Sequence, residues 1–598
     1  MQFRNDINGL RAIAVLPVIF FHAGMSSFGG GFLGVDVFFV ISGFLITSNI
    51  IKNQSQGNFS ILSFYDKRAR RILPPLILTL LLTLIFSFIF MLPYDLKNLG
   101  QSLIATSFGT NNILLYLTSG YWSLAAEFKP LYHTWSLGVE EQYYFIIPIV
   151  FILFFNKPKL LVSSIIMFFI ISVFSSYLVE NKEFNFLMVV TRFWELCAGS
   201  LLAMYMKNNM TFKSTVLSLL GLFMIFLSYS NPNFLSENQV FVNLLPVLGT
   251  VMVIAFTKRD SFVYRALSQR LIVIIGLSSY SIYLLHQPIL AFLRLATEDE
   301  VGVYKQLSFS LMSIPLGYLS WKFIESPFRS KSVVSNNVFY ILIPMFMITF
   351  ISTGFFLHKT YGMHKFDIFS KYSYGNNPQL YADRAYTLQS HRFVSSKKKN
   401  MLIIGNSFAR DLYNALEENK ALYGYEVIYL HNYDENKDLS RSLMRNADLT
   451  LWVSSSGLAN SLIDKKSLQS IATHRKNELI KYSNGNYFYI GTKNFGFNNN
   501  FVRHIDWNNS LDYMVDINKS NVHAERIESE IFSDRYISLL SLFGGGGKVR
   551  IFTDEHKFIS FDTEHLTKYG AIYLGKKLLN KTQLKDIILE SKLSSNKN

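Results

Sequence analysis

The stretch FLGVDVFFVISGFLI, residues 32–46, decides the class of this protein, because Asp36 is its one ionisable side chain. A helix needs about 20 mostly apolar residues to cross the hydrocarbon core of a bilayer. The apolar run continues to Ile51, so residues 33–51 reach that length. The stretch therefore predicts a helix that crosses a membrane.

Similar apolar runs recur along the first 358 residues and predict a multi-pass membrane domain. The stretch 99–117 is apolar too, but polar side chains interrupt it, and we interpret it as an interfacial or re-entrant helix. Eleven other runs predict membrane spans: ten belong to one domain, and the eleventh follows it. They lie at approximately 10–28, 33–51, 73–92, 143–155, 160–179, 186–206, 214–229, 239–256, 271–295, 305–324 and 338–357.

The distribution of charge separates this membrane part from the rest of the chain. Residues 1–358 contain 24 Lys and Arg against 16 Asp and Glu, and residues 359–598 contain 33 against 25, so each part has a net charge of +8. Only the second part has the charge density of a soluble domain. A chain that is 50% hydrophobic and 16% charged is not disordered, collagen-like or fully soluble.

Basic residues between the spans predict the orientation, since Lys and Arg concentrate on the cytoplasmic side. With the N-terminus inside, 16 of them fall in cytoplasmic segments and three, Lys97, Lys129 and Lys182, fall outside. A full span at 99–117 would invert this asymmetry, so we favour eleven spans. The last span then carries residues 359–598 to the outer side.

Ionisable side chains inside the spans are costly and are therefore functional candidates. His22 lies ~18 Å into the first span, and Arg11, three turns earlier, shares its helix face. Asp36 could orient this imidazole as a general base, although a packed structural histidine fits the pattern equally well. Arg192 and Glu195 could simply pair with each other. The ionisable side chains that we consider inside the predicted spans are Arg11, His22, Asp36, Arg192, Glu195, His286 and Arg294.

Basic residues are also concentrated in DKRARRILPP, residues 66–75, between the second and third spans. The spacing of Arg68 and Arg71 places two guanidiniums on one helix face, which suits a grip on a phosphate. Anchoring of the helix at the cytoplasmic surface is the alternative, and charge alone favours it. A cytoplasmic position would suit a donor that carries a nucleotide.

Seven motifs in this half, taken together and in order, resemble the membrane acyltransferase family 3. They are NDINGLRA (5–12), the spacing from Arg11 to His22, residues 32–46, Arg68 with Arg71, WSLGVEEQYY (135–144), SSYSIYLLHQP (278–288) and ESPFR (325–329). The resemblance covers about residues 1–330.

The resemblance implies transfer of an acyl group, usually acetyl, from cytosolic acyl-CoA to a carbohydrate of the cell envelope. It also implies that His22 and Arg11 are essential and that Arg68 and Arg71 engage the donor. Asp36, Glu140 and Glu141 fall on positions typical of the family and are expected to have supporting roles.

The outer domain opens with MLIIGNSFARDLY, residues 401–413, which predicts a buried strand, a tight turn and a helix. Ser407 falls at the turn, where free backbone N–H groups and the helix dipole can stabilise an oxyanion. A serine that merely caps the helix is equally compatible with this segment.

A second segment, FDTEHLTKYGA at residues 561–571, favours catalysis. Asp562 and His565 are spaced so that the carboxylate can orient the imidazole that deprotonates a serine. The two segments together resemble the SGNH hydrolase-like domains fused to such acyltransferases, over about residues 400–580. This resemblance implies that Ser407 is the nucleophile, His565 the base and Asp562 its orienting acid. Gly457 and Asn494 are candidate oxyanion donors.

The sequence thus predicts a membrane acyltransferase domain at 1–330, a further transmembrane helix at 331–358, a stem at 359–400 and an α/β, SGNH-like, three-layer domain at 401–590. We expect a bacterial inner-membrane protein with a cytoplasmic N-terminus and a periplasmic C-terminal domain. Its substrates would be acetyl-CoA and a cell-surface or lipid-linked glycan such as O-antigen, capsule or exopolysaccharide.

Other partners follow from composition. Membrane lipids surround the spans, and no nucleic-acid motif is present. The single cysteine, Cys197, rules out a thiol-ligated metal site, and we expect no metal. Two other functions stay open: an outer esterase that removes acyl groups, which leaves His22 without a task, and a glycan transporter, which leaves the serine and histidine unexplained.

Overall fold

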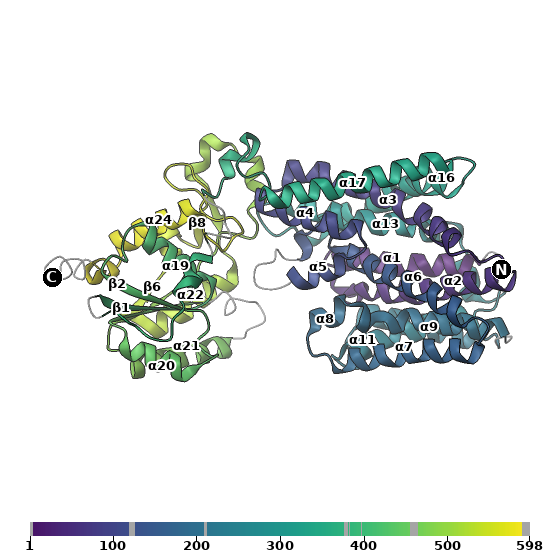
Figure 1. Cartoon of the computed structure of the whole chain (residues 1–598), viewed down its shortest axis with the longest axis horizontal. Coiled ribbons are helices and arrows are strands. Elements are labelled where there is room, and N and C mark those ends of the chain that lie inside the picture. The colour runs from purple at the N-terminus through teal and green to yellow at the C-terminus, as the bar shows by residue number, and fades with distance from the viewer. Residues whose placement is uncertain are drawn as a thin grey trace. The chain divides into compact units, whose positions relative to one another are not determined.

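The computed structural model describes residues 4–118, 126–208, 212–375, 381, 383–395, 398–454 and 465–588, and it contains two compact units (Figure 1). The helical unit comprises Met1–Ile89, Leu96–Arg294 and Val301–Lys359. The α/β unit comprises Phe90–Asp95, Leu295–Glu300 and Thr360–Asn598. The long final segment of the α/β unit begins at Thr360, close to the position near residue 358 where the charge density of the sequence changes.

The helical unit is built from helices that follow the apolar runs of the sequence. They are α1 (Asn5–His22), α2 (Gly34–Ser55), α3 (Ile61–Phe90), α4 (Pro93–Ser107), α5 (Asn111–Thr118), α6 (Trp135–Phe154), α7 (Pro158–Leu178), α8 (Lys182–Leu187), α9 (Val189–Asn208), α10 (Thr215–Ser230), α11 (Gln239–Phe256), α12 (Phe262–Leu267), α13 (Arg270–Leu295), α14 (Val303–Leu311), α15 (Ser313–Ser320), α16 (Ser326–Arg329) and α17 (Asn336–Lys359).

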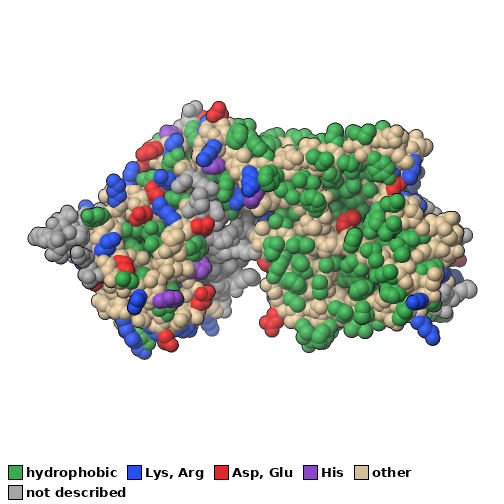
Figure 2. Space-filling model, in the orientation of Figure 1, with side chains coloured by type: hydrophobic (Ala, Val, Ile, Leu, Met, Phe, Trp, Pro, Cys, Tyr) green, Lys and Arg blue, Asp and Glu red, His purple; other side chains and the backbone are tan. Residues whose placement is uncertain are grey.

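Within the described ranges, eight helical segments are long and apolar enough to cross a membrane. They are Ser26–Ser55, Ile61–Phe90, Tyr132–Phe154, Pro158–Leu178, Lys182–Lys207, Gln239–Phe256, Arg270–Leu295 and Asn336–Lys359. Hydrophobic side chains cover the visible face of this unit (Figure 2). The prediction of a multi-pass helical membrane domain is confirmed.

The three remaining predicted spans also fall on helices, but on shorter or more polar ones. Helix α10 is apolar and short, α1 carries several polar side chains, and the tenth span is divided between α14 and α15. The stretch 99–117 is divided between α4 and α5, with Gly109 at a φ of +65° between them. It does not form one continuous span.

Helices α2 and α9 pack closely because glycines lie at their contact. A Cβ atom added at Gly43 would lie 1.9 Å from the carbonyl oxygen of Leu196, and one at Gly199 would lie 2.1 Å from that of Val40. Small residues let helix backbones approach in this way inside membranes. The α2–α9 pair therefore has little tolerance for a larger side chain at either position.

The α/β unit has a parallel sheet of five strands in the order β2-β1-β3-β4-β6. Its strands are β1 (Lys399–Ile404), β2 (Tyr425–Leu430), β3 (Leu449–Val453), β4 (Tyr487–Ile490) and β6 (Tyr536–Ile537). Sites in such sheets form at the carboxyl ends of the strands, where the strand order reverses. Here the order reverses at β1, so the end of β1 is the expected position of a site.

Helices cover both faces of this sheet (Figure 1). On one side, α19 (Ser407–Glu418) packs with α24 (Lys568–Lys581). On the other, α21 (Lys465–Tyr482) contacts both α20 (Lys437–Asn446) and α22 (Lys519–Phe532). A small antiparallel sheet of β5 (Met514–Asp516), β8 (Lys548–Arg550) and β7 (Gly544–Gly545) completes the unit. The predicted α/β class, with a layer of helices on each face, is confirmed.

Part of the segment predicted as a stem is packed into the α/β unit. It contains two short 3-10 helices, Asp367–Tyr372 and Arg384–Leu388, and buries aromatic side chains such as Phe369 and Tyr372. Arg384 donates a hydrogen bond of 2.6 Å to the Asn414 side chain on α19. The segment packs against the unit and does not form an extended stem, because its aromatic side chains supply apolar surface that can be buried.

Replacing Gly199 by valine should destabilise the helical unit by about 2 kcal/mol or more, because α2 and α9 must separate to admit the side chain. The measurement is the thermal unfolding midpoint of the full-length protein in detergent. Gly302→Ala is the matched control, since an added Cβ there meets nothing within 4 Å. Equal midpoints for Gly199→Val and wild type would refute the tight α2–α9 contact.

Candidate active site

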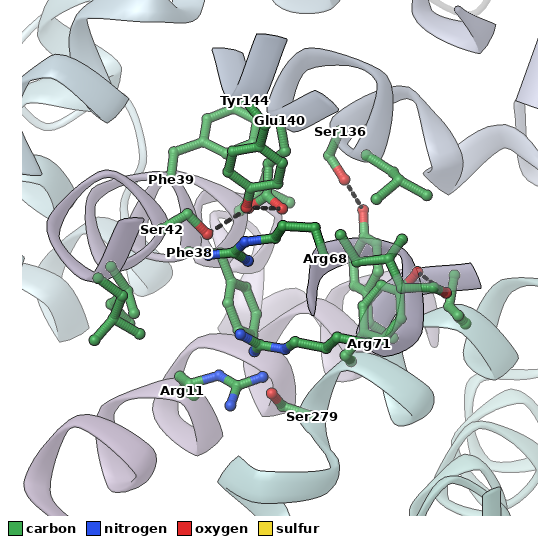
Figure 3. A pocket seen from close by; sticks show the side chains of 18 residues that line it. Arg11, Phe38, Phe39, Ser42, Arg68, Arg71, Ser136, Glu140, Tyr144 and Ser279 are labelled. Carbon is green, nitrogen blue, oxygen red and sulfur yellow. Dashed lines mark hydrogen bonds between the residues drawn. The ribbon is translucent and has the colours of Figure 1, made fainter. Parts of the chain in front are cut away.

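A small cavity of about 80 Å³ lies within the helical unit, between α1, α2, α3, α6 and α13. Three guanidinium groups point toward it, from Arg11, Arg68 and Arg71 (Figure 3). We call them the arginine cluster. In the part of the chain that the structure describes, none of the three has a hydrogen bond or an ion pair, although Arg68 stacks on the ring of Tyr144 at 4.7 Å. The cluster is therefore available to an anionic ligand.

The basic segment at the start of α3 divides into two faces. Arg68 and Arg71 face the cavity, as their spacing predicts. Arg70 is turned away and buried, and it donates hydrogen bonds to Asp66 at 3.1 Å and to Asn336 at 2.8 Å. Its contact with Asn336 ties α3 to α17. Anchoring and ligand binding thus involve different arginines of one segment.

Glu140 lines the same cavity and is held in place by two hydroxyl groups. Ser42 donates to one of its carboxylate oxygens at 2.7 Å, and Tyr144 donates to the other at 2.9 Å (Figure 3). Glu141 does not line the cavity, and its Oε1 is buried without a hydrogen-bond partner among the described residues. The two neighbouring glutamates therefore have different surroundings.

His22 belongs to a group of three histidines that the fold brings together, which we call the histidine cluster. Its ring lies 5.1 Å from that of His286, and the ring of His286 lies 5.4 Å from that of His133, centroid to centroid. Within the described ranges, no group of His, Cys, Asp or Glu side chains is arranged to hold a metal ion. Imidazole takes up and releases protons near neutral pH, so these three rings are suited to proton chemistry.

The hydrogen bonds of this cluster decide which ring nitrogen can act as a base. The Nδ1 of His22 lies 2.9 Å from the carbonyl oxygen of Val18. A carbonyl only accepts, so Nδ1 carries the proton of the neutral ring and Nε2 keeps its lone pair. His286 makes the same kind of bond to Tyr283 at 2.5 Å. His22 thus presents the nitrogen that a general base needs.

Asp36 does not orient His22, so that expectation was wrong. Its carboxylate is fully buried and lies 3.4 Å from Arg192, which also pairs with Glu195 at 3.2 Å. Asn243 adds a hydrogen bond to Glu195 at 2.9 Å. Asp36 is on the side of α2 that packs against α9. It therefore joins the predicted pair of Arg192 and Glu195 as a second carboxylate partner of Arg192.

The predicted triad of the α/β unit is assembled. Ser407 Oγ lies 2.8 Å from His565 Nε2, and His565 Nδ1 lies 2.6 Å from Asp562 Oδ2. Both Ser407 and His565 are about 1% exposed. This is the geometry in which a carboxylate orients an imidazole that removes the proton of a serine hydroxyl.

Local structure at the end of β1 places the serine. Gly405 has a φ of +140°, a conformation that L side chains rarely adopt. Asn406 caps α19, because its side chain accepts a hydrogen bond of 3.0 Å from the backbone N–H of Phe408. Ser407 is the first residue of the helix, so its hydroxyl does not serve as the cap and faces His565 instead.

Burial raises the pKa of Asp562, but the positive charge and hydrogen bonds of His565, with the backbone N–H of Glu564, outweigh it. The pKa of this carboxyl is therefore below its ordinary value. Its Oδ1 accepts bonds from the backbone N–H groups of Glu564 at 3.0 Å and His565 at 2.7 Å. The loop itself thus stabilises Asp562 as a carboxylate.

Of the two candidate oxyanion donors, Asn494 lies within the described residues. Gly457 lies outside the described residues. The side chain of Asn494 is engaged with backbone groups, accepting from Gly496 at 3.2 Å and Asn518 at 3.0 Å and donating to Gly496. Asn494 shapes the turn after β4, and its hydrogen bonds do not involve Ser407.

Sequence reasoning missed His133, which completes the histidine cluster. Both of its ring nitrogens are buried without a hydrogen-bond partner in the described structure. Its position two residues before WSLGVEEQYY was the available signal. The sequence placed Arg11 with His22, whereas the structure adds Arg11 to Arg68 and Arg71.

Comparisons with known proteins agree with the helical unit. A protein-family profile described as an acyltransferase domain matches residues 4–322. The peptidoglycan O-acetyltransferase OatA of Listeria monocytogenes is 31% identical over 352 residues, 55% of this chain and 56% of that protein. The O-acetyltransferase OatA of Staphylococcus aureus is 30% identical over 356 residues, 55% and 58% of the two. The matched stretch spans a little over half the length of these relatives.

One solved structure is matched as well. It is the periplasmic domain of a lipopolysaccharide acetyltransferase from Salmonella ser. Paratyphi A. The match covers 31% of this chain and 85% of that domain, with 18% identity and a TM-score of 0.25.

Asp562 should stabilise the α/β unit in a pH-dependent way. A carboxyl whose folded pKa is lowered adds stability above its unfolded pKa, near 3.9, and loses it as the pH falls through the folded value. Hydrogen exchange of β1 peptides in the full-length protein should therefore show a gap between wild type and Asp562→Asn at pH 7 that shrinks below about pH 4. Asp534→Asn, at an exposed position, should show no such trend. A gap that stays constant down to pH 3 would contradict the lowered pKa.

Proposed function

The chain belongs to the acyltransferase family whose domain its residues 4–322 match, and from this premise we propose that it is a membrane O-acyltransferase that modifies glycans outside the cytoplasm. The donor is acyl-CoA, most simply acetyl-CoA, and the acceptor is a hydroxyl of a cell-envelope polysaccharide or glycolipid. The observation that carries the proposal is the arginine cluster in one unit together with the triad of Ser407, His565 and Asp562 in the other.

The arginine cluster suits the donor because CoA carries several phosphates. Arginine binds phosphate through planar, charged hydrogen bonds and stays charged when it is partly buried. The three guanidiniums of the cluster line the cavity together with apolar side chains such as Phe38 and Leu45, so the cavity offers contacts both for phosphates and for a short acyl group. We therefore place the phosphates at the mouth of the cavity, with the thioester reaching inward.

His22 acts as the general base of the first transfer. Its Nε2 takes the proton of an attacking hydroxyl, the hydroxyl oxygen bonds to the acyl carbon, and the carbon–sulfur bond breaks. The CoA thiolate then takes the proton from the imidazole and leaves as CoA thiol. Arg11 and Glu140 line the cavity beside the donor and have supporting roles.

The α/β unit performs the second transfer. His565 takes the proton of Ser407, whose oxygen bonds to the acyl carbon, which arrives either directly from the first site or through a carrier hydroxyl. The bond from the acyl carbon to the thiol sulfur or the carrier oxygen breaks, and His565 gives its proton to that leaving group, which restores the neutral imidazole. A sugar hydroxyl then attacks this ester, His565 removes the sugar's proton, and Ser407 recovers it as the acyl group leaves. Asp562 keeps the imidazole oriented in both steps.

We place the protein in the inner membrane of a bacterium. The distribution of Lys and Arg supports a cytoplasmic N-terminus and an α/β unit on the outer side. Related proteins named O-acetyltransferases, one of them for peptidoglycan, support a cell-envelope glycan as acceptor and acetyl as the acyl group.

The rival function that the geometry favours most is an outer esterase. The triad by itself would hydrolyse an ester if water replaced the sugar hydroxyl in the second step. An esterase would use Ser407, Asp562 and His565, but it would give the arginine cluster no function. A glycan transporter would instead leave the triad without one.

The ester content of surface polysaccharide should distinguish these functions. In cells that express the full chain, His22→Ala and Ser407→Ala should each abolish the ester-linked acyl groups, because the two transfers run in series. Loss in His22→Ala alone would make the helical unit the sole transferase. More ester in Ser407→Ala than in wild type would make the α/β unit a deacylase.

Arg68→Gln and Arg71→Gln should each raise the KM for acetyl-CoA about tenfold, the loss expected for a charged hydrogen bond worth ~1.5 kcal/mol. Acetyl-pantetheine, which lacks the nucleotide phosphates, should be used equally well by variants and wild type. The control is Lys67→Gln, an exposed position in the same turn, with an unchanged KM. An unchanged KM for acetyl-CoA in both arginine variants would remove the donor from this cavity.

A further inference from the structure

A second ion pair lies beside the triad and has no part in the chemistry proposed above. Lys493, three residues after β4, is 1% exposed, and its ammonium lies 2.9 Å from the carboxylate of Asp411. The same ammonium donates a hydrogen bond to the backbone carbonyl of Glu564 and lies 3.4 Å from the centre of the Phe408 ring. Asp411 is only 2% exposed.

The pair holds the backbone on both sides of the catalytic histidine. Glu564 precedes His565, and its carbonyl is bonded by Lys493. Leu566 follows His565, and its N–H donates to Asp411 Oδ2 at 3.0 Å. The backbone N–H of Phe495, from the same turn as Lys493, donates to the carbonyl of Thr563 at 2.7 Å. The loop is thus gripped at three consecutive peptide units.

Asp411 also fixes this loop to the helix that carries the nucleophile. It lies four residues after Ser407 in α19, so the two side chains share one face of the helix, one turn apart. Ser407 contacts the ring of His565, and Asp411 contacts the peptide that follows it. One rigid helix face therefore aligns both the nucleophile and the loop of the base.

The loop needs such support because it contains a strained residue. Thr563 has a φ of +76°, which a β-branched side chain rarely adopts. Burying two charges is expensive unless they are paired and hydrogen-bonded, and these are both. Burial lowers the pKa of Lys493, and the charge of Asp411 opposes this shift. Burial of the charged Asp411–Lys493 pair next to His565 therefore costs free energy of folding, which is expected only where the pair has a role.

We propose that Asp411 and Lys493 are positioning residues that hold His565 at hydrogen-bonding distance from Ser407. They touch neither the acyl group nor the sugar, and they act through the backbone of the loop. This inference rests on the proposed role of Ser407 as the nucleophile. A misplacement of about 1 Å can cost a factor of a hundred in rate, so small movements of this loop are sufficient to matter.

The test is the rate at which a fluorophosphonate labels Ser407 in the purified full-length protein, measured from pH 5 to 9. Asp411→Asn, Lys493→Met and the neutral double variant should each lower the plateau rate about tenfold or more. The double variant should lose less than the product of the two single losses, because neither member of the Asp411–Lys493 pair is then left charged without the other. It also keeps the test valid if a single variant does not fold.

The pH midpoint of labelling separates positioning from a simple effect of charge. A carboxylate close to an imidazole raises its pKa, so a loosened Asp562–His565 contact lowers the midpoint in both single variants. A purely electrostatic influence would move the two midpoints in opposite directions, since one variant leaves a positive charge and the other a negative one. Opposite shifts with an unchanged plateau would overturn the proposal.

Arg441→Met provides the matched control, because Arg441 and Glu478 form another ion pair in this unit, at 3.0 Å between α20 and α21. Its labelling rate should equal that of wild type at temperatures below unfolding. An equal loss in the control would refute positioning. Labelling rates of the Asp411 and Lys493 variants within about twofold of wild type would refute it as well. A wild-type protein that labels no faster than Ser407→Ala would refute the nucleophile itself, and this outcome is distinct from failure of the pair.

Discussion

The cost of removing charge from water governs both units of this protein. A buried ionised group is tolerated only where partners replace its lost hydration. Asp36, Arg192 and Glu195 meet this requirement together at the contact of α2 with α9. In the described chain, the arginine cluster around the small cavity does not meet it. Groups that are paired hold helices together, and groups left unpaired mark the place where a ligand of opposite charge would complete the structure.

The same constraint explains the α/β unit. Its triad follows from the reversal of strand order at β1, where a tight turn at Gly405 leads directly into α19. The turn can place Ser407, but it cannot place a histidine that is 158 residues later. That task falls to the loop at 562–566, which is held by the buried pair of Asp411 and Lys493. The site therefore depends on charges that the reaction does not use.

The helical unit shows how close packing and polarity are combined in one membrane domain. Glycines at 43 and 199 bring α2 against α9. The same two helices carry the buried charged network of Asp36, Arg192 and Glu195. On the other face of α2, Ser42 bonds Glu140 at the arginine cavity. Helix α2 thus separates a buried ion-pair network on one face from a cavity lined by three arginines on the other. Substitutions on its two faces are therefore expected to have different consequences.

Apolar length, charge density and local spacing are properties of neighbouring residues, so the multi-pass domain, the α/β domain and the shared face of Arg68 and Arg71 could be predicted from the sequence. It also identified Ser407, Asp562 and His565, because each lies in a short recognisable segment. Which side chains meet across the fold was decided only by the tertiary structure. Asp36 pairs with Arg192 and not with His22, His133 joins the histidine cluster, and Lys493 reaches the catalytic loop. The physical reason is that these contacts depend on which faces of distant elements pack together, and a pattern read along one element does not contain that information.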